Sequence, residues 1–137
     1  MNILNRNKIT GTLTHTLNKY PEVIAAYLFG STASDKARFG SDVDVAVFFE
    51  EKLSKEEKFD LRLTLIATLE DVLSIEVDVV DLSAVSLTFQ HQVLRTGKLL
   101  FERDKQQRIA YEVRLRQEYF DFRPYIEHYQ KTVLKRL

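Results

Sequence analysis

Apolar positions along the chain follow two different spacings. Four short segments carry the continuous or alternating apolar pattern of β-strands, and they are Val23–Phe29, Val43–Phe49, Ile75–Leu82 and Leu99–Phe101. The first is apolar throughout, which is typical of a strand covered on both faces. The second and third alternate valine with acidic residues, so one face of each points toward a core. We therefore expect a sheet of three or four strands.

The segments between these strands show the apolar spacing of three to four residues that is typical of helices. The predicted helices cover residues 9–20, 32–39, 54–73, 86–96, 104–122 and 125–137. Ser54 and Glu57 have the spacing of a capping box at the start of the third helix. Pro21 and Pro124 are expected to end the helices before them, because proline has no amide hydrogen. This order of elements predicts an α/β (α+β) fold, a mixed sheet with flanking helices.

The composition fits a single globular domain. The chain has 137 residues, of which 45% are hydrophobic and 29% charged, so we assign residues 1–137 to one domain with 104–137 as its helical C-terminal extension. A formal net charge of zero argues against extended nucleic-acid contacts, although a local basic patch is compatible with it. The absence of cysteine excludes disulfides and thiolate zinc sites. With no signal peptide and no apolar run near the ~20 residues of a membrane span, we expect a cytoplasmic protein without membrane contact.

Candidate chemistry begins with two aspartates at the start of the second strand. Asp42 and Asp44 are two residues apart, so in a strand they project to the same face, opposite Val43 and Val45. Two carboxylates held that close repel one another unless a cation lies between them. Hard oxygen ligands favour Mg²⁺. The alternative is a pair of ordinary surface acids at a strand edge.

A turn follows the first strand at Gly30-Ser31. Glycine lets the backbone turn sharply and approach a ligand closely. Ser31 would then lie at or near a helix N-terminus, where amides and a hydroxyl can receive phosphate. A simple N-cap is the structural alternative for Ser31. A phosphate site beside paired carboxylates is an arrangement suited to nucleotide transfer.

A third carboxylate would complete such a site, and the third strand offers Glu76, Asp78 and Asp81. Alternation places Glu76 and Asp78 on the face opposite Val77. Asp81 falls on the apolar side or in the following turn, where its structural role would be to cap that turn. We favour Asp78, with Glu76 second and Asp81 last.

The pattern Gly30-Ser31, ten residues, Asp42-Val43-Asp44 resembles the signature of the polymerase-β-type nucleotidyltransferases. The segments VDVVDLSAVS and VLRTGKLLFERD are similar to the minimal (MNT-type) members, most closely the antitoxins encoded beside HEPN-domain toxins. The resemblance covers residues 25–104 well and the last thirty-odd residues loosely. It implies two Mg²⁺ ions held by Asp42, Asp44 and Asp78, and ATP phosphates contacted by Gly30 and Ser31.

The same resemblance implies an activity and a partner. The activity would be transfer of AMP from ATP to a tyrosine hydroxyl of a HEPN-domain toxin, which neutralises the toxin in a hetero-oligomeric complex. One alternative is a non-catalytic antitoxin that acts by binding alone. Another is nucleotidyl transfer to a small-molecule hydroxyl, although relatives of that kind usually carry a further substrate domain.

Aromatic residues are concentrated near the C-terminal end. They are Tyr111, Tyr119, Phe120, Phe122, Tyr125 and Tyr129. For any single one of them, packing between the last helices is the simpler interpretation. As a group, interleaved with arginines, they suit the docking of a helical partner.

Overall fold

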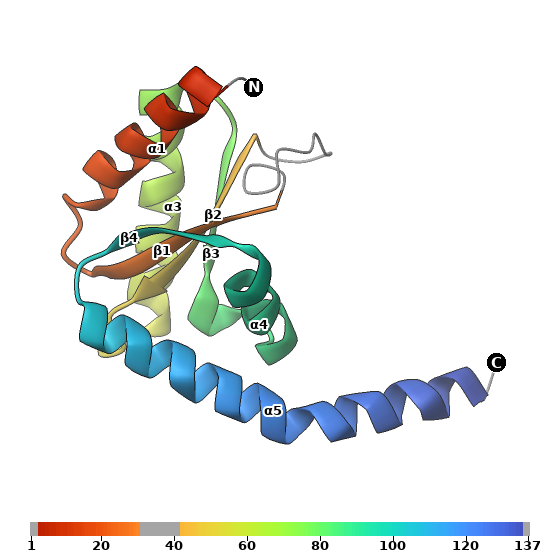
Figure 1. The fold of residues 1–137 in the computed structure, drawn as a ribbon. Coiled ribbons are helices and arrows are strands. Elements are labelled where there is room, and N and C mark those ends of the chain that lie inside the picture. The colour runs from red at the N-terminus through yellow and green to blue at the C-terminus, as the bar shows by residue number, and fades with distance from the viewer. Residues whose placement is uncertain (1–2, 31–41, 136–137) are drawn as a thin grey trace.

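The computed structural model describes residues 3–30 and 42–135, which form a four-stranded sheet with helices on both faces (Figure 1). The elements in order are α1 Ile3–Leu17, β1 Val23–Phe29, β2 Val43–Phe49, α3 Lys55–Leu73, β3 Val77–Asp81, the 3₁₀ turn η1 Leu82–Ala84, α4 Leu87–Thr96, β4 Lys98–Glu102 and α5 Lys105–Lys135. This architecture confirms the predicted mixed sheet with flanking helices. The helix predicted over residues 32–39 lies outside the described residues.

The strand order in the sheet is β3-β2-β1-β4. β1 pairs antiparallel with both β2 and β4, whereas β2 and β3 are parallel and are joined by α3 as the crossover helix. β1 and β2 have the predicted bounds. β3 is shorter than predicted by two residues at its start and one at its end, and β4 is longer by one residue at each end. β3 lies at one edge of the sheet, and its first residue, Val77, pairs with Val43, the first residue of β2.

The valines of β2 and β3 anchor one of two core layers. Val43, Val45 and Val79 are fully buried with residues of α1 and α3 on one face of the sheet. Ala46 and Phe48 point to the other face, where α4 and α5 pack. Period-two alternation thus leaves Asp44 of β2 and Asp78 of β3 on the α4 side.

The first helix ends earlier than the sequence predicts. α1 stops at Leu17, three residues before Tyr20, and the chain continues in tight turns. The physical reason is a side chain distant in sequence: the Arg103 guanidinium donates to the backbone carbonyls of Leu17 at 3.4 Å, Asn18 at 2.9 Å and Tyr20 at 3.1 Å. These bonds satisfy carbonyls that have no partner within the helix, and so they stabilise the turns that follow Leu17.

Pro124 does not end the last helix, so the prediction of two separate C-terminal helices is wrong. α5 runs unbroken from Lys105 to Lys135 with Pro124 inside it. Proline removes one helical hydrogen bond, the one to the carbonyl of Phe120. Both residues are exposed, so water can satisfy that carbonyl. A break is therefore not required at this position.

A charged cluster around Glu112 fastens the first half of α5 to the sheet. The Glu112 carboxylate accepts hydrogen bonds from the Tyr27 hydroxyl at 2.9 Å, from Arg108 and from Arg116 at 3.2 Å. Burial raises the pKa of Glu112, but the bonds from Arg108 and Tyr27 outweigh it and hold the pKa below its ordinary value. The carboxylate is therefore ionised and fully used at the interface between α5 and β1.

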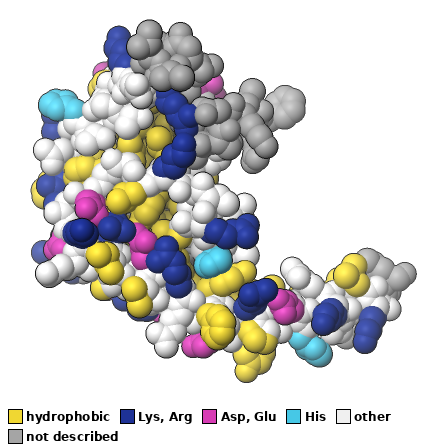
Figure 2. All heavy atoms as spheres, viewed as in Figure 1, with side chains coloured by type: hydrophobic (Ala, Val, Ile, Leu, Met, Phe, Trp, Pro, Cys, Tyr) yellow, Lys and Arg dark blue, Asp and Glu magenta, His cyan; other side chains and the backbone are white. Residues whose placement is uncertain are grey.

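The second half of α5 exposes most of the late aromatic residues. Tyr111 is buried and stacks on Phe48, and Tyr119 stacks on His91 with ring centroids 3.7 Å apart. The remaining four are exposed by 47–72%, namely Phe120, Phe122, Tyr125 and Tyr129. Packing therefore explains two of the six aromatic residues. The part of α5 after Leu115, which we call the arm, projects from the body and carries hydrophobic side chains among charged ones (Figure 2). Within the described part of the chain, no helix is long and apolar enough to cross a membrane.

Candidate active site

The turn after β1 brings the backbone against an aspartate of β2. Gly30 has a φ of +69°, in the left-handed region that favours glycine. A Cβ atom at Gly30 would lie 2.6 Å from Asp44 Oδ2, closer than real contacts allow. Glycine is thus required here for both its backbone conformation and the space it leaves. The neighbouring Ser31, the predicted phosphate contact, lies outside the described residues.

Asp44 and Asp78 face one another across the parallel pair of strands. They are register partners in β2 and β3, and both lie partly exposed on the face of the sheet opposite the buried valines. Burial, and then the negative charge of Asp78, raise the pKa of Asp44. This is the electrostatic signature of two carboxylates that would be stabilised by a cation.

Arg62 of α3 reaches over the edge strand to this pair. Its Nε atom donates to the Val79 carbonyl and its Nη2 atom lies 3.5 Å from Asp78 Oδ1. The sequence reasoning did not single out this arginine. The available signal was the spacing of the basic residues Lys55, Lys58 and Arg62, which places them on neighbouring turns of α3.

Asp42 lies one step further along, just before β2. Its carboxylate accepts a hydrogen bond from the Glu76 backbone amide at 3.3 Å, and it borders a pocket of about 510 Å³ lined also by Lys8 and Ile75. Among the residues that the structure describes, no group of three or more acidic, histidine or cysteine side chains is placed to hold a metal ion. The structure therefore brings Asp44, Asp78 and Gly30 together, and the role of Asp42 as a third ligand stays a prediction.

The two other acidic candidates on the third strand have different surroundings. Asp81 is 8% exposed and accepts hydrogen bonds from the Ser83 amide at 2.9 Å and the Ser83 hydroxyl at 2.8 Å. It caps the turn into η1, as the sequence analysis expected of its structural role. Glu76 is exposed and precedes the strand. Asp78 is the acid of this strand that lies beside Asp44.

Substitution of the two aspartates of β3 should separate chemistry from structure. We expect Asp78→Asn to keep nucleotide binding and lose turnover by a hundredfold or more, since it removes a charge beside Asp44. Asp81→Asn should keep turnover and lower stability by about 1 kcal/mol, the scale of a lost cap. Single-turnover transfer rates, nucleotide titration and thermal melting test both. Equal loss of turnover in the two variants would mean that the third carboxylate is misassigned.

The family model "Polymerase beta, Nucleotidyltransferase" matches residues 11–106, which include Gly30, both strands of the aspartate pair and β4. This match spans well over half of the chain. The chain belongs to this nucleotidyltransferase family. The site built from Gly30, Asp44 and Asp78 therefore lies within the nucleotidyltransferase domain, and the predicted membership is confirmed.

Similar proteins include an adenylyltransferase and two structures of toxin–antitoxin complexes. The protein adenylyltransferase MntA of Shewanella oneidensis is 33% identical over 101 residues, 74% of this chain and 68% of that protein. A crystal structure of a toxin–antitoxin with AMP-PNP superposes with a TM-score of 0.70 at 28% identity, covering 95% of this chain and 98% of that one. The structure of a tri-AMPylated Shewanella oneidensis HEPN toxin in complex with its MNT antitoxin gives a TM-score of 0.67 at 28% identity, covering 98% and 99%.

Proposed function

We propose that this nucleotidyltransferase is an antitoxin that transfers AMP from ATP to a tyrosine hydroxyl of a cognate HEPN-domain toxin in the cytoplasm. The observation that carries the proposal is the Asp44–Asp78 pair held against Gly30, inside a domain that belongs to the family. The relatives described as protein adenylyltransferase and as MNT antitoxin, and the complex with AMP-PNP, support AMP as the group transferred and a HEPN toxin as its acceptor.

The donor set of the site fits magnesium. Asp44 and Asp78 offer carboxylate oxygens. Burial, and then the charge of Asp78, raise the pKa of Asp44, and a divalent cation between the two carboxylates would offset both effects. We propose Asp42, Asp44 and Asp78 as the ligands of two Mg²⁺ ions. When bound, Mg²⁺ supplies neutralisation of phosphate charge and lowers the pKa of the attacking hydroxyl.

The residues of the chain then have separate tasks. Gly30 and Ser31 hold the phosphates of ATP at the turn after β1. Asp78 accepts the proton of the tyrosine hydroxyl, whose oxygen forms a bond to the α-phosphorus. The bond from that phosphorus to the α–β bridging oxygen breaks, and pyrophosphate leaves. The products are AMP-tyrosine on the toxin and pyrophosphate.

The toxin would be held partly by the projecting half of α5. Phe120, Tyr125 and Tyr129 are each about 70% exposed, and aromatic side chains are enriched among interface anchors. One related toxin is described as tri-AMPylated. We therefore include in the proposal the transfer of more than one AMP to the same acceptor.

Intact-mass spectrometry tests this function. The purified protein, the toxin encoded beside it and Mg²⁺ are incubated with each of the four nucleoside triphosphates, and both chains are weighed. A toxin mass gain of one or more AMP units, from ATP and absent with Asp44→Asn, is the expected result. A stable complex with no mass gain would replace the proposal by inhibition through binding alone. No gain and no complex would favour a small-molecule acceptor.

A further inference from the structure

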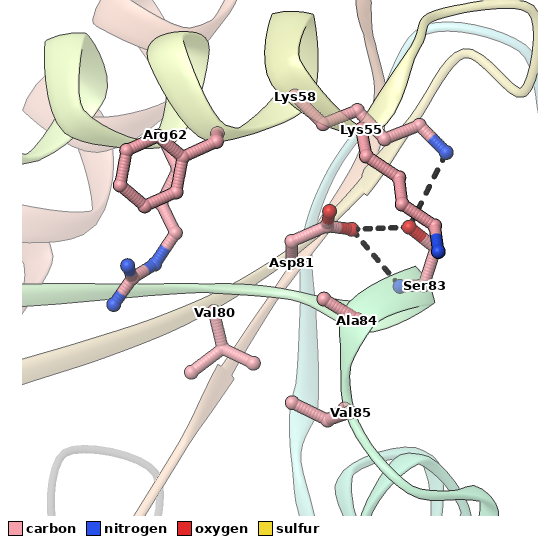
Figure 3. Close-up of a pocket in the computed structure, with 9 residues that line it drawn as sticks. Lys55, Lys58, Arg62, Val80, Asp81, Ser83, Ala84 and Val85 are labelled. Carbon is pink, nitrogen blue, oxygen red and sulfur yellow. Dashed lines mark hydrogen bonds between the residues drawn. The ribbon is translucent and has the colours of Figure 1, made fainter.

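A basic groove lies along the free edge of the sheet, between α3 and the end of β3. It has a volume of about 610 Å³. Lys55, Lys58 and Arg62 line it from α3, and residues 80–81 and 83–85 line it from β3, η1 and the residue after η1 (Figure 3). These lining residues belong to none of the tasks described above except that Arg62 also touches Asp78.

The charges of the groove are unbalanced toward the positive. Its one lining carboxylate, Asp81, is turned to Ser83 and accepts two hydrogen bonds there. Lys58 donates a hydrogen bond to the Ser83 hydroxyl at 3.2 Å. The partner in this bond is a neutral hydroxyl and not a carboxylate. A chain of zero net charge thus gathers three cations along one side of one helix. Such a groove favours an anionic ligand.

An aromatic side chain accompanies these cations. Phe59 also lines the groove, and its side chain is 55% exposed, so the ring is accessible to a ligand there. A positive groove that follows a phosphate backbone, with an aromatic ring on which bases stack, is the common arrangement for binding single-stranded nucleotides.

The groove adjoins the aspartate pair on the side of Asp78. Arg62 at one end contacts Asp78, and the groove continues along β3 toward Val85. Gly30, where donor phosphates are proposed to bind, lies on the other side of Asp44, because β1 and β3 flank β2. The groove and the proposed donor site at Gly30 therefore lie on opposite sides of Asp44. Lys55 and Arg62 are about 10 Å apart along the helix axis, room for more than one phosphate.

We infer that this groove binds the nucleotide already attached to the acceptor, with its phosphodiester against Lys55, Lys58 and Arg62 and its base on Phe59. The inference rests on the proposed function. In the second transfer, a ribose hydroxyl oxygen of the attached AMP forms a bond to the α-phosphorus of a new ATP. The α–β anhydride bond breaks, pyrophosphate leaves, and the hydroxyl proton passes to Asp78. Lys55, Lys58 and Phe59 thus serve elongation of the attached chain and have no part in the first transfer.

The test counts AMP units on the toxin over time. Two groove variants are used, the double variant Lys55→Gln/Lys58→Gln and the single variant Phe59→Ala. The matched controls are Lys19→Gln/Lys105→Gln, two exposed lysines away from the groove, and Leu63→Ala, an exposed apolar residue of the same helix. Intact mass gives the species with one, two and three AMP units, and peptide mapping locates them on residues. Thermal melting confirms that each variant is folded.

The expected result has three parts. The wild type adds successive AMP units to one residue. Both groove variants make the first addition within about twofold of the wild-type rate, and they make the second at least tenfold more slowly. The controls match the wild type at every step. A labelled triadenylate should bind the wild type more tightly than the groove variants, with an affinity that falls as salt is added.

Other outcomes overturn the inference in distinguishable ways. A wild type that adds a single AMP, or adds AMP units to separate residues, overturns the role of the groove and the repeated transfer, and it leaves AMP transfer to the toxin standing. Groove variants that elongate at the wild-type rate do the same. Loss of the first addition in the groove variants would instead assign the groove to the toxin or to ATP. No AMP on the toxin at all would remove the proposed function, and the groove with it.

Discussion

Asp44→Asn is expected to lower AMP transfer on the order of a thousandfold and to leave the protein folded. Asp44 is the carboxylate that both Gly30 and Asp78 approach, so its charge is the one around which the site is built. Asparagine keeps the shape and removes the charge that would hold a cation. The measurement is the initial rate of toxin AMP gain with Mg²⁺ and ATP. The control is Asp60→Asn, which changes an exposed aspartate of α3.

The same substitution should not lower thermal stability without metal. The pKa of Asp44 is raised above its ordinary value of 3.8, so the folded state holds the ionised form less well than the unfolded state does. Stability is therefore lost as the pH rises through the raised pKa, and asparagine avoids that loss. A melting temperature equal to or above the wild type at pH 7, with the difference vanishing below pH 3.8, is expected. An unfolded Asp44→Asn would contradict this account of the site.

The second large effect is expected from Gly30→Ala. The added methyl group would meet Asp44 Oδ2 at 2.6 Å, and alanine in the left-handed region costs a further 1–2 kcal/mol, roughly. Either the turn or the aspartate must move, so transfer should fall by about a hundredfold. Activity and melting temperature are both measured.

Gly11→Ala provides the control for that experiment. Gly11 lies within α1, and a Cβ atom there meets nothing within 4 Å. Alanine should therefore keep full activity and raise stability by about 1 kcal/mol, the helix-propensity difference. If Gly30→Ala behaved like Gly11→Ala, the turn after β1 would not be the phosphate site.

Some features of the site depend only on residues near in sequence, and the sequence predicted these features. The alternation of β2 and β3 placed Asp44 and Asp78 on one face, and the turn signal at Asp81 identified a cap, because both depend only on near neighbours. The placement of Asp42 was less accessible. It precedes the strand, where alternation no longer fixes direction, and its carboxylate is held by the backbone of Glu76 from another element.

Other features depend on contacts between segments far apart in the sequence, and these were not predicted. The end of α1 depends on Arg103, some eighty residues later, and the use of Arg62 depends on which strand forms the sheet edge. Pro124 was expected to break a helix because proline is unfavourable in helix interiors. In the exposed part of α5, water can bond to the carbonyl that Pro124 leaves without a partner, and the helix continues.

The attachment of α5 gives it the properties of a lever. Its buried residues, Tyr111, Glu112 and Leu115, all lie near one end of a helix of 31 residues. From Leu115 to Lys135 the arm extends about 30 Å. A tilt of about 10° at the Glu112 cluster would displace the far end by about 5 Å, so a small change in that cluster becomes a large movement at the tip. The distance between Asp78 and a partner bound to the arm would therefore depend on the Glu112 carboxylate, which takes no part in the reaction.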